Sequence, residues 1–175
     1  MNINIKDLIK ENKNLRRINR NLFKLAYNDS KFKCLNRNWL DENKKYYNDK
    51  NLYLGFIDVN NLKFTNDNYG HNKGDELIFS IVKKFNDISL KYNDNNMLLI
   101  RLGGDEFLVI SNCKNNINQL EKSISKIASI GICEKMKSES FYHAMKRADQ
   151  LMYKQKRKSK KLEIVHDDEN KYMVC

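Results

Sequence analysis

Proline is absent from this 175-residue sequence, so its turns must be made by glycine, asparagine or aspartate. Cysteine is scarce, and the four that occur are widely spaced, at Cys34, Cys113, Cys133 and Cys175. None belongs to a Cys-x-x-Cys pair, and the three histidines do not complete a zinc-binding pattern. These absences exclude a zinc-finger class and favour reduced thiols.

Long hydrophobic runs are also missing. No stretch of about 18 apolar residues occurs, which excludes a membrane-spanning helix. The first residues, Met1–Lys6, contain no apolar core of the kind found in signal peptides, so we expect no such peptide. The sequence therefore predicts a cytoplasmic protein.

Positive charge is in excess: 33 Lys and Arg residues against 22 Asp and Glu residues give a formal net charge of +11. This excess indicates either an anionic partner, such as a nucleotide, nucleic acid or membrane surface, or a lysine-rich surface without a dedicated partner. No predicted helix carries one long basic stripe interleaved with aromatic residues, so nucleic acid is not favoured. The length and the hydrophobic content of 41% predict one compact domain with a small appendage.

Residues 1–27 form a predicted helix in which Leu8, Leu15 and Leu22 recur every seven positions. This heptad pattern is too short to establish a coiled coil. It leaves two interpretations open: a stalk that dimerises two catalytic domains, or an amphipathic helix packed on its own domain.

The rest of the chain alternates predicted strands and helices. We expect strands at 52–59, 97–102, 106–110, 127–133 and 162–165, and helices at 36–47, 73–90, 117–125 and 140–156. The apolar strand at 52–59 shows no polar alternation, which places it at the centre of the sheet. This order predicts an α/β (α+β) fold with a mainly antiparallel sheet of about five strands flanked by helices.

The chemistry centres on the segment Arg101–Phe107, which reads RLGGDEF. Its two glycines lie between apolar runs and predict a β-hairpin with a two-residue turn, because Gly-Gly accepts the positive φ that such turns require. Asp105 and Glu106 follow the bend, and Asp58 ends the predicted central strand. If the hairpin pairs with that strand, these carboxylates could hold two divalent ions, one activating a 3′-hydroxyl and the other neutralising a triphosphate.

Four separate blocks of this sequence, in the right order, resemble the GGDEF family of diguanylate cyclases. They are Asp58–Asp67 with Gly70–Asp75, the signature Gly103–Phe107, Ser129–Gly131, and Ala148–Lys156. The resemblance extends from Asp29 to about Lys161. It implies the ferredoxin-like palm of nucleotidyl cyclases, with a catalytic domain at 28–166 between the N-terminal helix at 1–27 and a flexible tail at 167–175.

By this resemblance, Asp58, Asp105 and Glu106 are catalytic and bind Mg²⁺ (or Mn²⁺), assisted by the carbonyl of Val59. The residues implied in substrate binding are Lys63, Lys156 and Lys160 for phosphates, Asn66 and Asp75 for guanine, and Gly103 and Gly104 for close approach of the hairpin backbone. An aspartate suits guanine because it can accept from N1–H and the exocyclic amine together, whereas adenine leaves it unpaired.

The sequence departs from the family pattern at three places. Asn60 replaces the second aspartate of the Asp-x-Asp pattern, so we expect weaker metal affinity. The opening motif keeps Asp29 but has the sequence KFKC at 31–34 in place of Leu-Thr-Gly-Leu. The family's Arg-x-x-Asp product-inhibition motif is replaced by Asp94 and Met97, so we expect no feedback through that site.

The resemblance implies a homodimeric enzyme that condenses two GTP into cyclic di-GMP with release of pyrophosphate, one GTP being held by each protomer. Two alternatives stay open: a non-catalytic GTP-binding signalling module, and a palm nucleotidyltransferase that makes another cyclic or linear nucleotide. The sequence shows no sensor domain, so we expect either a fragment of a longer protein or control by dimerisation or by a regulatory partner.

Overall fold

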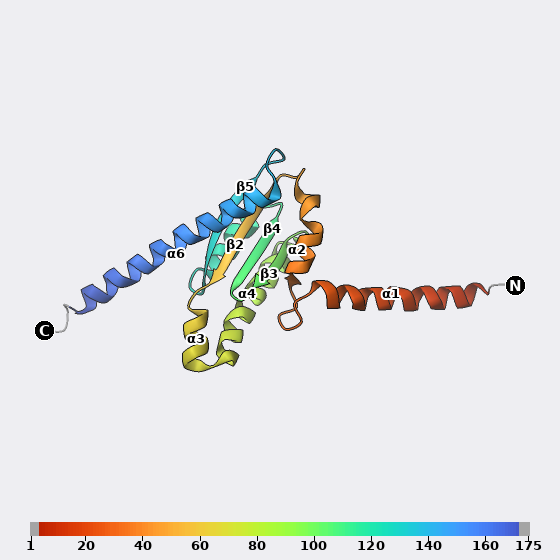
Figure 1. Cartoon of the computed structure of the whole chain (residues 1–175), viewed down its shortest axis with the longest axis horizontal. Coiled ribbons are helices and arrows are strands. Elements are labelled where there is room, and N and C mark those ends of the chain that lie inside the picture. The colour runs from red at the N-terminus through yellow and green to blue at the C-terminus, as the bar shows by residue number, and fades with distance from the viewer. Residues whose placement is uncertain (1–3, 172–175) are drawn as a thin grey trace.

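The computed structural model describes residues 4–171, with side chains described as far as residue 158. Figure 1 shows a twisted sheet packed between helices, with α1 and α6 extending away on opposite sides. The elements, in chain order, are α1 (Ile5–Tyr27), β1 (Leu35–Asn36), α2 (Arg37–Asn43), the 3₁₀ helix η1 (Lys44–Tyr47), β2 (Leu52–Val59), α3 (Leu62–Tyr69), α4 (His71–Lys91), β3 (Leu98–Gly103), β4 (Glu106–Ser111), α5 (Lys114–Ile124), β5 (Ala128–Lys135) and α6 (Phe141–Lys171).

The five strands form one sheet in the order β1-β3-β4-β2-β5. All neighbours are antiparallel except β1 and β3, which run parallel. β2 lies between β4 and β5, which confirms the central position that its apolar sequence predicts. The mostly antiparallel sheet flanked by helices confirms the predicted α+β palm.

Each face of the sheet carries its own hydrophobic core. On one face, α4 and α5 pack through residues such as Ile81 and Leu120, which are fully buried against the sheet. On the other face, α2 and α6 pack through Leu40, Ala144 and Ala148. Because β2 is covered on both sides, its side chains are buried on both faces except near its ends.

The fifth strand is not the one that the sequence predicts. Residues 162–165 lie inside α6, so the prediction of a strand there is wrong. Neither glycine nor proline occurs after Gly131, and nothing therefore interrupts the helix. The fifth strand is instead β1, whose two residues are too few to show any periodicity. The predicted tail at 167–175 begins within α6, and residues 172–175 lie outside the described part of the chain.

Two local features at the functional end of the sheet differ from the sequence prediction. The segment after β2, for which no helix is predicted, contains the helix α3, which follows Asn61 in the left-handed conformation at φ 56°. The hairpin turn is Gly104-Asp105 rather than Gly103-Gly104, because Gly103 pairs with Glu106 across the strands. A register shift between Arg101 and Gly103 moves the turn along by one residue.

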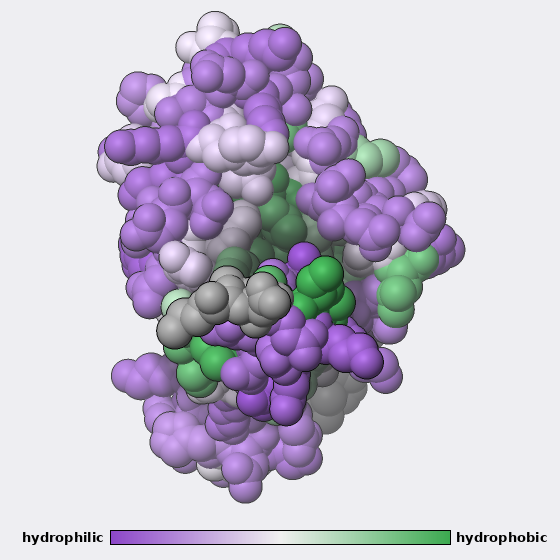
Figure 2. Space-filling view, turned by 90° about the vertical axis from the view of Figure 1, so that its right-hand side faces the viewer, coloured by the Kyte–Doolittle hydropathy of each residue, from purple (hydrophilic) through white to green (hydrophobic). Residues whose placement is uncertain are grey.

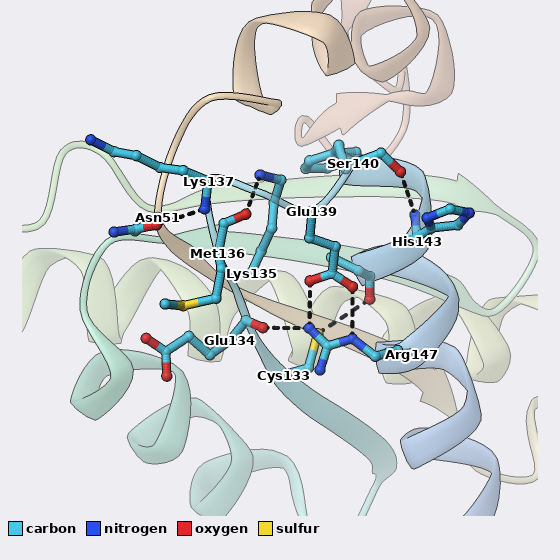
Figure 3. A network of polar contacts seen from close by, with 12 residues as sticks. Asn51, Cys133, Glu134, Lys135, Met136, Lys137, Glu139, Ser140, His143 and Arg147 are labelled. Atoms are coloured by element: carbon cyan, nitrogen blue, oxygen red, sulfur yellow. Dashed lines mark hydrogen bonds and ion pairs between the residues drawn. The ribbon is translucent and has the colours of Figure 1, made fainter.

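A polar network fixes the connection between β5 and α6 (Figure 3). Lys135 is fully buried, and its ammonium donates to the carbonyls of Asn48, Lys50 and Met136 at 2.6, 3.1 and 3.1 Å. Arg147 of α6 forms two hydrogen bonds to the carboxylate of Glu139, at 2.8 and 2.6 Å. This network sets the direction in which α6 crosses the sheet.

Helix α1 contributes no buried residue to the domain. It extends away from the sheet in Figure 1, and Leu8, Leu15 and Leu22 are each at least half exposed. Figure 2 views the molecule from this side and shows a largely hydrophilic surface with a few hydrophobic groups. The alternative in which α1 packs on its own domain is therefore wrong. Within residues 4–171, no helix combines the length and the apolar content needed to cross a membrane.

Candidate functional site

Two carboxylates from neighbouring strands face each other at one end of the sheet. Asp58 of β2 lies directly opposite Glu106 of β4 in the antiparallel register, so both side chains point to the same face. The N–H of Val59 donates to the carbonyl of Asp105 at 3.0 Å, which holds the hairpin turn against the end of β2. The structure thus brings Asp58, Asp105 and Glu106 to one corner.

Negative charge is concentrated around Glu106. Burial raises the pKa of its carboxyl, and the charges of Asp105, Asp58 and Asp149 raise the pKa further. Arg37, at the start of α2, partly opposes this rise. A corner with this balance attracts cations and favours a proton on Glu106.

Asp149 and Arg37 belong to this corner, although the sequence analysis assigned neither a role. Asp149 lies seven residues before Lys156 on α6, and this spacing of about two helical turns places both on one face of the helix. From this spacing, a place for Asp149 near the site could have been predicted. Nothing local in the sequence indicated that Arg37 approaches Glu106, because α2 reaches the site only through its packing on the sheet.

Lys156 forms an ion pair with Asp58. Its ammonium lies 2.5 Å from Asp58 Oδ1, and the side chains are 27% and 13% exposed. We predicted a phosphate contact for Lys156, and the structure places its cation beside the carboxylate that would ligate a metal. Lys156 therefore lies within reach of any phosphate bound at Asp58.

The donor set suits a hard divalent cation. Carboxylate and carbonyl oxygens are the ligands that Mg²⁺ prefers, and it usually takes one or two carboxylates together with substrate phosphates. Among the side chains that the structure describes, at residues 4–158, no group of three or more His, Cys, Asp or Glu is arranged to enclose an ion. The arrangement thus fits a metal held partly by a bound nucleotide, and it does not form a complete cage by itself.

The hairpin turn is accessible to a ligand, and Arg101 fixes its backbone. A Cβ added to Gly103 or Gly104 would meet no atom within 4 Å, so the backbone is accessible to a ligand. Arg101 donates to the carbonyl of Gly104 from two nitrogens, at 3.1 and 2.7 Å, and pairs with Asp29 at 2.9 Å. Burial alone would raise the pKa of Asp29, but hydrogen bonds from Phe32 N–H and Arg101 outweigh it and lower the pKa.

The predicted guanine-binding residues lie on the helix pair α3 and α4. A Cβ built on Gly74 would fall 1.9 Å from Asn66 Oδ1, so the Asn66 side chain lies directly on the α4 backbone beside Asp75. Asp75 is 20% exposed and forms an ion pair with Lys31, from the turn between α1 and β1. In the sequence, Lys31 is distinguished only as a departure from the family motif.

The other predicted residues are dispersed. Lys63 is exposed in the first turn of α3, shortly after β2 ends. Lys160 lies in α6 beyond residue 158, so its side chain is outside the described part. Asn60 accepts a hydrogen bond from the Ser129 hydroxyl at 3.0 Å, which gives the residue in place of the family aspartate a structural partner on β5.

Asp94 and Met97, at the positions of the family's product-inhibition motif, are both engaged in the fold. Asp94 Oδ2 accepts from Asn116 at 2.7 Å and from Ser111 at 3.2 Å. Met97 is 4% exposed and packs in the core with α4 and α5. The absence of product inhibition through this site stays a prediction.

Comparison with known proteins identifies relatives of the whole domain. A family described as "Diguanylate cyclase, GGDEF domain" matches residues 26–129. Diguanylate cyclase DgcP of Escherichia coli is 31% identical in an alignment of 180 positions. The alignment covers 86% of this chain and 50% of DgcP. The probable diguanylate cyclase DgcI of the same organism is 29% identical over 78% of this chain and 32% of its own length. The chain thus spans half or less of these curated relatives.

Solved structures share the fold. The crystal structure of the coiled coil and GGDEF domain of DgcB from Caulobacter crescentus, in complex with c-di-GMP, matches with a TM-score of 0.71. It is 22% identical and covers 87% of this chain and 92% of its own. Diguanylate cyclase SiaD of Pseudomonas aeruginosa, solved with its activator SiaC, matches at 0.72 with 21% identity over 88% of this chain and 67% of its own.

Proposed function

Because this chain belongs to the GGDEF family of diguanylate cyclase domains, we propose that it condenses two GTP into cyclic di-GMP and releases pyrophosphate from each. The observation that supports this most directly is the register that sets Asp58 opposite Glu106, with Asp105 held beside them. Phosphoryl-type transfer depends chiefly on positioning and charge stabilisation, and this corner provides both.

The proposed chemistry is the same in each half-reaction. The 3′-oxygen of one GTP bonds to the α-phosphorus of the other, and the bond from that phosphorus to the oxygen leading to the β-phosphate breaks. Glu106 takes the proton of the 3′-hydroxyl, and pyrophosphate leaves. The raised pKa of Glu106 makes its carboxylate a stronger base than a solvent-exposed glutamate.

Asp58, Asp105 and Glu106, with the carbonyl of Val59, would hold Mg²⁺ or Mn²⁺. When bound, such an ion neutralises phosphate charge and makes a hydroxyl more acidic. Asn60 would contribute little because Ser129 already occupies its side-chain oxygen.

The substrate would be bound from three sides. Lys63 and Lys156, with Lys160 further along α6, contact the phosphates. Asn66 and Asp75 contact guanine, and the open backbone of Gly103-Gly104 allows the nucleotide to approach closely. This assignment selects GTP because only guanine presents two adjacent donors to Asp75.

The proposed active form is a homodimer with one GTP on each protomer, related by a two-fold axis. Each 3′-hydroxyl then faces the α-phosphate of the opposite nucleotide. The exposed leucines of α1 would join the two chains as a short coiled coil. The structure of DgcB cited above also contains a coiled coil with its GGDEF domain.

The decisive experiment is incubation with Mg²⁺ and each nucleoside triphosphate, alone and mixed, with products identified by mass spectrometry. We expect cyclic di-GMP from GTP alone. Asp58→Asn and Glu106→Gln should each lower the rate by about a hundredfold or more, because each removes a charge from the reacting corner. Glu42→Gln, an exposed change on α2, is the matched control and should leave the rate unchanged.

Three results would contradict this proposal. Binding of GTP without release of pyrophosphate would indicate a non-catalytic signalling module. A different cyclic or linear product would indicate another palm nucleotidyltransferase, and equal turnover of ATP alone would contradict the assignment of Asp75.

A further inference from the structure

The turn between α1 and β1 brings a cation to the predicted guanine site. Lys31 forms an ion pair with Asp75 of α4, 44 residues away in sequence. The backbone of this turn is held in place, because the N–H groups of Lys31 and Phe32 donate to Asp29 Oδ1 at 3.0 and 2.8 Å. The base of the Lys31 side chain is therefore fixed near α4.

The outer part of Lys31 is free to adjust. Its side chain is 54% exposed, whereas that of Asp75 is 20% exposed. A partly exposed ion pair of this kind contributes little to the stability of the fold. A ligand can therefore enter between or beside these groups at little cost, while both remain within reach.

The pair offers three neighbouring hydrogen-bonding groups. The ammonium of Lys31 is a donor, and the two carboxylate oxygens of Asp75 are acceptors. Guanine presents the complementary set: O6 is an acceptor, and N1–H and the exocyclic amine are donors. Adenine presents a donor, an acceptor and a C–H group along the same edge, so it matches the pair at no position.

We propose that Lys31 is a specificity-determining residue, whose ammonium donates to guanine O6 while Asp75 accepts from N1–H and the exocyclic amine. This inference rests on the proposed function, because it takes the site at Asn66 and Asp75 to bind GTP. O6 has two lone pairs, so Lys31 and Asn66 can both donate to it. The charged residue in place of the family leucine thereby adds a contact to the base.

The test separates the acceptor O6 from the two donors of the base, N1–H and the exocyclic amine. Binding of GTP, 6-thio-GTP and ITP is measured by calorimetry, on protein carrying Glu106→Gln to prevent turnover. Sulfur is a weak acceptor, so 6-thio-GTP loses the contact to Lys31, whereas ITP lacks the exocyclic amine and loses a contact to Asp75. Hydrogen bonds to charged groups change affinity by about tenfold or more.

We expect protein with Lys31 to prefer GTP over 6-thio-GTP by about tenfold or more, and Lys31→Met to reduce this preference to about twofold or less. The preference for GTP over ITP should persist in Lys31→Met, and Lys31→Arg should restore discrimination at O6. Lys73→Met is the matched control. It removes the same charge from α4, where Lys73 pairs with Glu76, and should change neither preference.

Two outcomes would overturn the proposed role of Lys31 and leave the proposed function standing. One is an unchanged preference for GTP over 6-thio-GTP in Lys31→Met. The other is equal weakening of GTP, 6-thio-GTP and ITP, which would indicate that Lys31 only supports the turn. Failure of every protein to bind GTP would instead overturn the proposed function itself, and the role of Lys31 with it.

Discussion

The position of Glu106 favours function and lowers the stability of the folded protein. Its carboxylate is partly buried and lies near three other acidic residues, Asp58, Asp105 and Asp149. Like charges at such short range disfavour the ionised form, and Arg37 compensates for them in part. Crowding of this kind supports metal binding and proton transfer, while it lowers the stability of the empty site.

Glu106→Gln should therefore make the unliganded protein more stable at neutral pH while it stops turnover. The folded-state pKa of Glu106 is raised, so the folded protein binds this proton more tightly than the unfolded chain does. Wild-type stability from this group is complete below the ordinary value of 4.5 and is lost as the pH rises through the folded pKa.

Thermal unfolding followed by circular dichroism, from pH 3.5 to 8, would measure this effect. The variant should gain in melting temperature at pH 7, and the gain should disappear as the pH falls below 4.5. Glu42→Gln should stay within about 0.5 kcal/mol of wild type at every pH. A Glu106→Gln variant less stable than wild type at pH 7 would contradict this explanation.

At the scale of elements, the position of α6 on β5 determines whether Asp149 and Lys156 reach the site. The two elements touch at Gly131, where an added Cβ would fall 2.1 Å from both Ala148 O and Met152 N. Both atoms belong to the helix backbone and cannot move aside alone. The N–H of Ile130 also donates to Gln155 Oε1 at 2.6 Å, so the contact is fixed on both sides of the glycine.

Gly131→Ala should destabilise the fold by about 3 kcal/mol, because the helix must shift as a whole to admit one methyl group. Gly55→Ala is the matched control on β2. There the nearest atom to the new Cβ is Ile130 Cδ1, the end of a flexible side chain, at 2.9 Å. We expect a loss of about 1 kcal/mol for this control. Urea unfolding measures both values, and equal losses would show that the contact at Gly131 is not decisive.

At the scale of the whole molecule, α1 is a helix that packs little against the described part of its own chain. None of its residues is buried, although its leucines repeat at heptad spacing. An isolated helix of 23 residues gains little stability from propensity alone, so a second copy is the natural source of its packing. The proposed reaction also requires two protomers.

The double variant Leu15→Asp with Leu22→Asp should weaken dimerisation by more than about a hundredfold. Each buried leucine contributes about 2 kcal/mol, and the charges would face each other across the seam. Sedimentation velocity measures the dimer, and production of cyclic di-GMP should fall with it. Binding of GTP to each protomer should persist, because neither leucine belongs to the proposed nucleotide site.

Lys13→Asp with Arg20→Asp is the matched control, since these positions lie opposite the leucine seam. This variant should remain dimeric at the concentrations at which the leucine variant is monomeric. Dimerisation of the leucine variant at wild-type affinity would exclude α1 as the stalk.

Local patterns in the sequence predicted the order of the main elements and the composition of the reacting corner. The apolar run of β2 predicted a central strand, and the glycines before Asp105 predicted a hairpin, because both signals are local and depend on neighbouring residues. Asp58 and the acidic pair Asp105-Glu106 were found in the same way. The signature motifs then predicted the palm.

Which distant groups meet could not be predicted from the sequence and follows from the packing of the folded chain. The pairing of Lys31 with Asp75, Lys156 with Asp58, and Arg37 near Glu106 depends on how the turn before β1, α6 and α2 pack on the sheet. The hydrophobic periodicity of the sequence does not predict such contacts, because they depend on how whole elements pack. The same reason explains why the sequence does not predict β1. Its two residues form a strand because they pair with β3.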